Sequence, residues 1–253
     1  MKKVLFLGSK PIGHYCLLLL IEKQAELGIE LVGALSNDNS RFDPTKSISK
    51  LCELNQVPFI EDLDQILDMD VDIMISVQYH LILKKPHIDV AKEIAVNLHM
   101  APLPEYRGCN QFSFALFNQS KVFGTTLHRL EEGIDSGPIM FERRFDIEAN
   151  DDVSSLYQKT FEESKLLFAE SISDLVKGAY QLKPQSEYFE EREHNLYYRK
   201  DIQKLKQIDL NESADTIIRA VNSSSMPGFE PPFALIDGKK YYIIPEKHYS
   251  NGK

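Results

Sequence analysis

The chain has 253 residues, of which 43% are hydrophobic and 26% are charged, so it can bury a substantial core and does not have the composition of a disordered protein. Its 29 basic and 38 acidic residues give a net charge of −9. Residues 1–180 account for the whole excess of acidic residues, with 18 basic and 27 acidic groups, whereas residues 181–253 hold 11 of each. Such a surface repels polyanions, which argues against a nucleic-acid partner.

Three further classes of protein are disfavoured. No apolar run approaches the roughly 20 residues of a membrane-spanning helix, and the short apolar N-terminus lacks a signal-peptide cleavage site. We therefore expect a cytoplasmic protein with no membrane partner. Neither the three cysteines nor the seven histidines show the spacing of metal ligands, so we expect no metal and no disulfide framework.

Strand and helix patterns alternate over the first hundred residues. Apolar runs at 4–7, 31–35, 57–60, 73–77 and 94–98 predict buried strands, and helical patterns fall at 11–27, 47–54, 63–67 and 84–92. Pro11 and Gly28 mark the two ends of the first helix. The alternation predicts an α/β fold, with a Rossmann-like, mostly parallel sheet and helices on both faces.

The pattern changes after this point. Runs at 124–130 and 138–147 predict an antiparallel addition to the sheet, and residues 153–176 predict a long amphipathic helix that begins after Asp151 and Asp152. Residues 184–212 read as a polar arm or linker. A short helix at 213–222, capped by Ser213, and a β-hairpin at 233–236 and 240–244 follow. We expect a domain at 1–180 and an appendix at 181–253, made of the arm, the small helix and the hairpin.

The first candidate site is the turn after the first predicted strand, which reads GSKPIG over residues 8–13. This is neither a dinucleotide fingerprint nor a P-loop. It is either a plain tight turn or a helix N-terminus that receives an anionic group with the help of Lys10. Open α/β sheets bind ligands at the carboxyl ends of their strands, where this turn lies.

Asn97 and His99 end the fifth predicted strand. Because they are two residues apart, their side chains face the same side of the sheet. An asparagine can donate hydrogen bonds to a developing oxyanion, and a histidine can act as a general base near neutral pH. The pair alone also fits a structural histidine at a strand end.

Asp135 and His128 lie further along the chain. Asp135 stands between two glycines in the loop that joins the later strands, where it is either a turn former or a carboxylate that orients His99. His128, on the preceding strand, either lines the same cavity or faces solvent.

Taken together, these motifs resemble the folate-dependent formyltransferase family. Asn97-x-His99, the loop PLPEYRG at 102–108, the strand GTTLH at 124–128 and Asp135-Ser-Gly, 36 positions after His99, occur in the family's order and spacing. The resemblance covers residues 1–180. Family members commonly read His-[Pro/Gly]-Ser-Leu-Leu-Pro where this chain reads HMAPLP from His99, so the shape of this loop is expected to differ.

The resemblance implies that N10-formyltetrahydrofolate donates a formyl group to a primary amine. Asn97 would bind the carbonyl oxygen, His99 would manage the amine proton, and Asp135 would hold the imidazole and a water. The pterin is expected against backbone of two loops. The expected cofactor-binding residues are Gln78, Tyr79, His80, Leu81, Ile82, Leu83, Leu130, Glu132 and Asp135.

The resemblance also narrows the choice of acceptor substrate. The transfer-RNA enzymes carry a longer, basic C-terminal domain and the purine enzymes usually stop near the long helix, whereas this chain has a short, charge-neutral tail. The run YRGCNQFSF at 106–114 looks like that of enzymes acting on dTDP-linked amino sugars. We therefore expect dTDP-4-amino-4,6-dideoxyglucose or a 3-amino relative. Methionyl-tRNA or glycinamide ribonucleotide formylation, and a non-catalytic folate- or nucleotide-binding module, are the alternatives.

On this reading a nucleotide-sugar diphosphate, the small-molecule partner, lies near the turn at 8–13 and the loop after Tyr106. The expected substrate-binding residues are Ser9, Lys10, Tyr106, Arg107, Gly108, Cys109, Asn110 and Gln111. Four aromatic residues near the hairpin either form its core or a dimer contact, or stack on a base: Phe229, Phe233, Tyr241 and Tyr242. We expect a homodimer.

Overall fold

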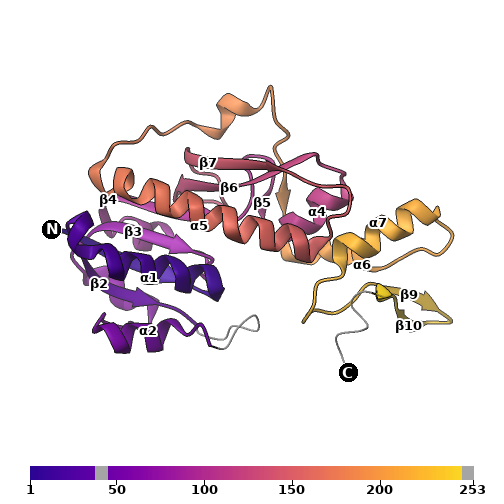
Figure 1. Ribbon diagram of the computed structural model, residues 1–253, viewed down its shortest axis with the longest axis horizontal. Helices are drawn as coiled ribbons and strands as arrows, with labels where there is room; N and C mark the ends of the chain where they lie inside the picture. The colour runs from indigo at the N-terminus through magenta and orange to yellow at the C-terminus, as the bar shows by residue number, and fades with distance from the viewer. Residues whose placement is uncertain (38–44, 247–253) are drawn as a thin grey trace.

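A six-stranded mixed sheet forms the centre of the protein, which a computed structural model describes over residues 1–37 and 45–246 (Figure 1). Four strands are parallel, in the spatial order β2 (Ile29–Leu35), β1 (Lys2–Gly8), β3 (Val71–Val77) and β4 (Ala91–His99). Next come β6 (Val122–Arg129), antiparallel to β4, and β7 (Ile139–Asp146), antiparallel to β6. This confirms the predicted α/β fold and the antiparallel addition.

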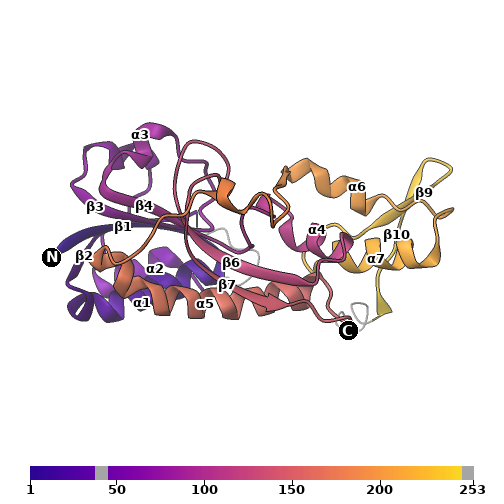
Figure 2. The same cartoon turned by 90° about the horizontal axis from the view of Figure 1, so that it is seen from above.

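Helices cover both faces of the sheet (Figure 2). One face carries α1 (Lys10–Leu27), α2 (Ile48–Asn55) and α5 (Val153–Lys177), and the other carries α3 (Lys85–Ile88) and the arm that follows α5. Because side chains alternate along a strand, β1 supplies both cores: Val4 and Phe6 belong to the cluster under α1 and α5, and Leu5 and Leu7 to the opposite one.

The long helix α5 begins and ends as its sequence predicts. The Asp152 carboxylate accepts hydrogen bonds from the backbone N–H groups of Ser154 and Ser155, at 2.9 and 2.8 Å, which satisfies donors that the first turn leaves unpaired. Gly178 ends the helix in the left-handed conformation, with a φ of 72°. The buried side of α5 packs on α1 and on β6.

Two predicted elements are wrong. Residues 57–60 form only a single bridge, between Phe59 and Ala34, and not a strand. Pro58 has no N–H to donate to a ladder, although its carbonyl accepts from Ala34. The helix predicted at 84–92 is limited to α3, because β4 already begins at Ala91. The short helix predicted at 63–67 is a 3-10 helix, η1 (Leu63–Asp68).

The chain after α5 crosses back over the sheet. It contains η2 (Gln185–Tyr188), β8 (Leu196–Tyr197), η3 (Arg199–Ile202) and α6 (Gln203–Lys206). β8 pairs with β5 (Arg107–Gly108), which precedes α4 (Gln111–Phe117). The expected arm therefore has more structure than its composition predicts. Hereafter the arm means residues 184–202.

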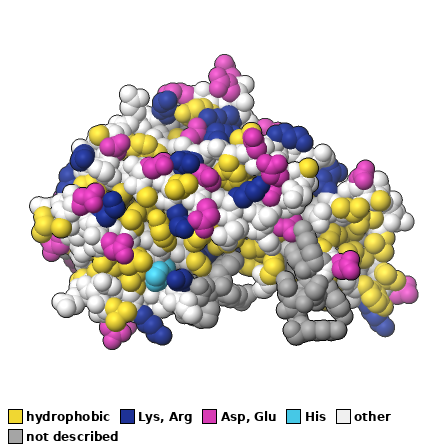
Figure 3. Space-filling model, viewed as in Figure 1, with side chains coloured by type: hydrophobic (Ala, Val, Ile, Leu, Met, Phe, Trp, Pro, Cys, Tyr) yellow, Lys and Arg dark blue, Asp and Glu magenta, His cyan; other side chains and the backbone are white. Residues whose placement is uncertain are grey.

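The predicted small helix and hairpin are present as α7 (Ala214–Ser224) and the antiparallel pair β9 (Phe233–Ile236) and β10 (Lys239–Tyr242). Figure 3 shows apolar side chains gathered over this part of the molecule. Ile218, Leu235, Tyr241 and Tyr242 are each about half exposed. These exposed apolar side chains are compatible with a homodimer but do not test it, so the expected homodimer stays a prediction. The division of the chain at residue 180 also stays a prediction. No helix in the described ranges combines the length and hydropathy that a membrane crossing requires.

Phe168 offers a test of the α5 packing, because its side chain is fully buried in the core under α1 and α5. We expect Phe168→Ala to lower the free energy of unfolding by about 3–5 kcal/mol, through lost burial and the cavity that remains. Leu166, which is 45% exposed on the same helix, is the control, and Leu166→Ala should cost less than about 1 kcal/mol. Urea denaturation measures both values, and equal losses would contradict this packing.

Candidate active site

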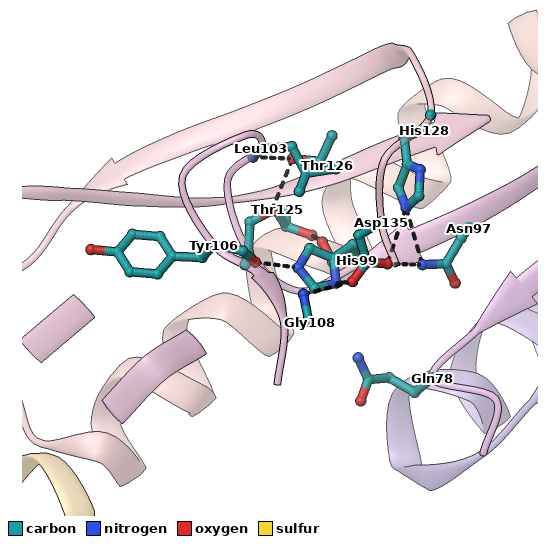
Figure 4. A network of polar contacts seen from close by, with 12 residues as sticks. Gln78, Asn97, His99, Leu103, Tyr106, Gly108, Thr125, Thr126, His128 and Asp135 are labelled. Atoms are coloured by element: carbon teal, nitrogen blue, oxygen red, sulfur yellow. Dashed lines mark hydrogen bonds and ion pairs between the residues drawn. The ribbon is translucent and has the colours of Figure 1, made fainter. Parts of the chain in front are cut away.

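The candidate catalytic residues meet where the sheet changes from parallel to antiparallel. Asn97 and His99 lie at the carboxyl end of β4, and β6 runs antiparallel beside them, so that Asn97 pairs with His128 and His99 with Thr126. The loop between β6 and β7 then brings Asp135 to the same place (Figure 4). His99 and His128 are both buried, at 4% and 1% exposure.

The Asp135 carboxylate is the centre of this cluster. Its Oδ2 accepts a hydrogen bond from the Gly108 N–H at 2.9 Å and lies 3.6 Å from His99 Nδ1. Its Oδ1 lies 3.5 Å from His128 Nε2 and accepts from the Asn97 amide at 3.4 Å. Four groups from three segments of the chain therefore converge on one carboxylate.

These contacts fix the charge of Asp135. Burial alone would raise its pKa, but the positive charge that His99 and His128 can carry and the Gly108 N–H outweigh this effect and hold the pKa well below its usual range. Asp135 is therefore an anion at neutral pH.

Carbonyl partners fix the tautomers of both histidines, because a carbonyl oxygen can only accept. His99 lies between two acceptors, because Nε2 is 2.7 Å from the Tyr106 carbonyl and Nδ1 is 3.6 Å from the Asp135 carboxylate. The carbonyl is the closer of the two, so neutral His99 donates from Nε2 and has its lone pair on Nδ1; the protonated ring donates to both. His128 Nδ1 donates to the Arg129 carbonyl at 2.9 Å. His128 Nε2 is then the acceptor for the Asn97 amide, 3.2 Å away.

Two threonines of β6 hold the loop after His99. Thr125 Oγ1 donates to the His99 carbonyl at 3.0 Å, and Thr126 Oγ1 donates to the Ala101 carbonyl at 2.9 Å. Met100 and Ala101, which replace the residues common in the resembled family, are buried in the core. The loop is therefore held both by buried side chains and by hydrogen bonds from β6, and the expected difference in its shape stays a prediction.

A lysine and a glutamine face the cluster from the neighbouring strands. Lys10 Nζ donates to Gln78 Oε1 at 2.8 Å, and Figure 4 shows the Gln78 amide beside Asn97 and Gly108. Burial lowers the pKa of Lys10, and the nearby charge of Arg199 lowers it further. Lys10, Gln78, Asn110 and Asp135 all have positive φ values, between 46° and 62°. Non-glycine residues rarely adopt this conformation, and it gathers at functional sites.

The loops expected to hold the pterin lie on the far side of Gln78. Within the described part of the chain, the backbone of residues 79–83 makes no hydrogen bond to another backbone group, and Leu81 and Ile82 are exposed. Leu83 is almost fully buried. An open groove of about 340 Å³ borders the second loop and is lined by Leu130 and Glu132, together with Ile88, Ala95 and Arg129. The groove also carries the charged side chains of Lys85, Asp89, Glu93 and Glu131, and residues 79–83 are not part of its lining. The expected pterin contacts therefore stay a prediction.

The expected substrate-binding residues take three kinds of position. Arg107 and Cys109 are partly exposed, and the Arg107 Nε is buried without a partner in the described structure. Ser9 is buried and donates to Asn37, and Gln111 is buried at the start of α4. The Tyr106 ring points away from the cluster into the core, so this residue contributes its carbonyl and not its ring (Figure 4).

Sequence reasoning missed the contribution of the arm. The Asn110 amide donates to the carbonyls of Tyr198 and Arg199, and Arg107 and Cys109 donate backbone hydrogen bonds to Asn195 and Tyr197. No pattern in the polar arm indicates these contacts, because they depend on where the chain returns across the sheet.

A family model described as formyl transferase matches residues 39–172, more than half of the chain. The chain belongs to the formyl transferase family. It is therefore an enzyme that transfers a one-carbon group, as the sequence motifs predict.

Relatives of this formyl transferase extend the likeness over nearly the whole chain. GDP-perosamine N-formyltransferase of Brucella melitensis is 26% identical over 245 residues, which cover 95% of this chain and 92% of that protein. The structure of a sugar N-formyltransferase from Shewanella sp. has a TM-score of 0.78 at 21% identity, covering 97% of each chain. An N-formyltransferase from Helicobacter canadensis, solved with folinic acid and dTDP-3-aminofucose, also has a TM-score of 0.78 at 21% identity, covering 95% of this chain and 86% of that one.

The hydrogen bonds of the two imidazoles make a prediction about this formyl transferase. In their neutral forms His99 carries its proton on Nε2 and His128 on Nδ1, because each of these nitrogens faces a carbonyl. Imidazole 15N chemical shifts distinguish the two tautomers, and His99→Gln and His128→Gln identify the signals. Neutral His99 with its proton on Nδ1 would contradict this geometry.

Proposed function

We propose that this formyl transferase moves a formyl group from N10-formyltetrahydrofolate to the primary amine of a nucleotide-linked amino-dideoxy sugar. The observation that carries the proposal is the likeness to GDP-perosamine N-formyltransferase, which extends over 95% of the chain and so includes the arm, α7 and the hairpin. The catalytic residues proposed are Asn97, His99 and Asp135.

The residues expected to bind the acceptor favour a small anionic substrate. Lys10, Arg107 and Arg199 lie near the turn and the loop where a diphosphate is expected, in a chain whose net charge is −9. An arginine fork suits phosphate oxygens, and the Arg107 Nε has no hydrogen-bond partner among the residues that the structure describes. We propose dTDP-4-amino-4,6-dideoxyglucose or a 3-amino relative as the acceptor. The Brucella relative makes GDP-perosamine the alternative to be tested beside it.

The donor side fits a pterin. Backbone groups of residues 79–83 can pair with the amide edge of the ring, and the exposed Leu81 and Ile82 offer apolar contact. The folinic acid bound by the Helicobacter protein, whose fold is the same, supports a folate here. We expect Gln78, between these loops and Lys10, to lie where the two substrates meet.

The cluster can perform each proton and charge movement of the transfer. The acceptor amine attacks the formyl carbon, a C–N bond forms, and the carbonyl oxygen becomes an oxyanion that the Asn97 N–H stabilises. The lone pair on His99 Nδ1 takes the amine proton, and Asp135 stabilises the imidazolium. Breakage of the bond to N10 then returns this proton to the departing folate nitrogen. Holding both substrates together supplies the rest of the acceleration.

A panel of acceptors tests the proposed substrate class. The protein is incubated with N10-formyltetrahydrofolate and, in parallel, with dTDP-4-amino-4,6-dideoxyglucose, its 3-amino isomer, GDP-perosamine, glycinamide ribonucleotide and methionyl-tRNA. We expect mass spectrometry to detect a gain of one formyl group on a nucleotide sugar, because residues 181–253 carry equal numbers of basic and acidic groups and so lack the net positive charge that favours transfer RNA. Formylation of methionyl-tRNA alone would contradict the proposal, and no product from any amine would revive the non-catalytic alternative.

Substitutions test the proposed roles of the cluster. We expect His99→Ala to lower kcat about 10²–10⁴-fold through loss of the base. Asn97→Ala should lower kcat about 10²–10³-fold, through loss of the oxyanion donor. Gln158→Ala, which removes a hydrogen bond to Glu162 on the exposed side of α5, is the control for general damage. Turnover near the wild-type value in a folded His99→Ala protein would show that the base is assigned wrongly.

A further inference from the structure

The arm contacts three segments that hold or adjoin the proposed catalytic residues. Gln185 reaches the loop that holds Asp135, Arg192 reaches the loop after His99, and β8 pairs with Arg107–Gly108, whose N–H binds Asp135. These three points are spread over residues 185–197, so one continuous stretch of chain contacts all three segments.

Gln185 makes the most direct of these contacts. Its side chain is buried, at 6% exposure, and its Nε2 donates to the Asp135 carbonyl at 2.7 Å and to the Gly137 carbonyl at 2.8 Å. Both N–H groups of the amide are therefore used on the backbone of one loop. No other residue type of this length presents two such donors without a charge.

The Asp135 backbone needs this support. Its φ of 46° is in the left-handed region, which costs energy for a residue with a Cβ. A carboxylate that must lie between His99 and His128 cannot tolerate rotation of its own peptide, because a misplacement of about 1 Å costs on the order of a hundredfold in rate. One hydrogen bond from Gln185 holds the Asp135 carbonyl, and a second holds the Gly137 carbonyl of the same loop.

The strand β8 holds the other partner of the carboxylate. The N–H groups of Arg107 and Cys109 donate to the carbonyls of Asn195 and Tyr197, at 3.2 and 2.8 Å, and so fix the peptide on each side of Gly108. A Cβ on Gly108 would lie 2.2 Å from the Tyr197 carbonyl, and its φ is 89°, so only glycine permits this approach. The Tyr197 ring stacks on Phe114 with centroids 4.1 Å apart.

Arg192 binds the third segment, the loop after His99. It donates to the Leu103 carbonyl at 3.1 Å and forms a two-point ion pair with Glu142 of β7, at 2.7 and 2.9 Å. The loop after His99 is thus bound to the arm as well as to the threonines of β6.

We propose that the arm is the positioning element of the active site and that Gln185 is its principal positioning residue, which sets the place of the Asp135 carboxylate between the two imidazoles. The inference rests on the proposed catalytic role of Asp135. Gln185 touches neither the reacting atoms nor the expected substrates, so it acts on the rate only through Asp135.

The test compares wild type, Gln185→Met and Asp135→Asn. Methionine keeps the length of the side chain but donates no hydrogen bond. Two readouts are used: kcat and KM for N10-formyltetrahydrofolate and for the best acceptor of the panel above, and the pH titrations of the His99 and His128 imidazoles by NMR, which need no substrate. Thermal unfolding verifies that each variant is folded.

We expect Gln185→Met to lower kcat about ten- to a hundredfold, with both KM values within about threefold of wild type. The imidazole titrations should shift in the direction that Asp135→Asn shifts them, because the carboxylate has moved away. Gln185→Glu should be more severe at neutral pH, since a carboxylate repels the two carbonyls. It should recover relative to Gln185→Met at low pH, where a protonated carboxyl regains one donor.

Gln158→Met is the matched control, because Gln158 is an exposed glutamine of α5 whose amide only contacts Glu162. It should leave kcat and the imidazole titrations unchanged. If Gln185→Met does not fold, Gln185→Asn, which keeps the amide but shortens its reach, replaces it with the same expectation.

Three results would overturn the inference: a folded variant with kcat within about twofold of wild type, a raised KM with unchanged kcat, or imidazole titrations identical to wild type. Failure of the proposed function is separate from these. It appears as full activity in Asp135→Asn, or as no product from any acceptor. In either case the imidazole titrations, which need no substrate, are the test of the positioning role.

Discussion

One buried carboxylate organises this protein. The Asp135 side chain is only 15% exposed, and an anion so largely removed from water is stable only where hydrogen bonds and opposite charges surround it. Here the partners are the Gly108 N–H, the Asn97 amide and two imidazoles. They come from three segments, β4, β5 and β6, so the requirement to neutralise one charge brings together the segments that the proposed reaction needs.

The sheet supplies the place where this can happen. At β4 its direction of pairing changes, from parallel with β3 to antiparallel with β6. The carboxyl end of β4 therefore meets the carboxyl end of β3 on one side and the middle of β6 on the other. Gln78 after β3, Asn97 and His99 on β4, and His128 on β6 reach one space for this reason alone. The later Asp135 loop closes it.

The arm completes the arrangement from the solvent side. In a chain whose core lies on the two faces of the sheet, loops at a strand edge are ordinarily its least constrained part. Here Gln185, Arg192 and Tyr197 bind three of these loops. The C-terminal part of the chain thus contributes to the active-site geometry as well as to an apolar, exposed end of the molecule.

The sequence by itself determined the sheet, the long helix that begins after Asp152, and the placement of Asn97 and His99 on the same face of their strand. These follow from local periodicity and from a spacing of two residues. The order and spacing of the motifs also indicated the family. The strand expected at 57–60 failed because a proline lacks a donor and the segment has a single bridging pair. Only the tertiary structure decided that His128 faces Asp135, that the Tyr106 carbonyl and not its ring serves the site, and that Gln185 holds the Asp135 loop. These contacts join residues that are 7 to 50 positions apart, and no local pattern records where a returning chain will cross.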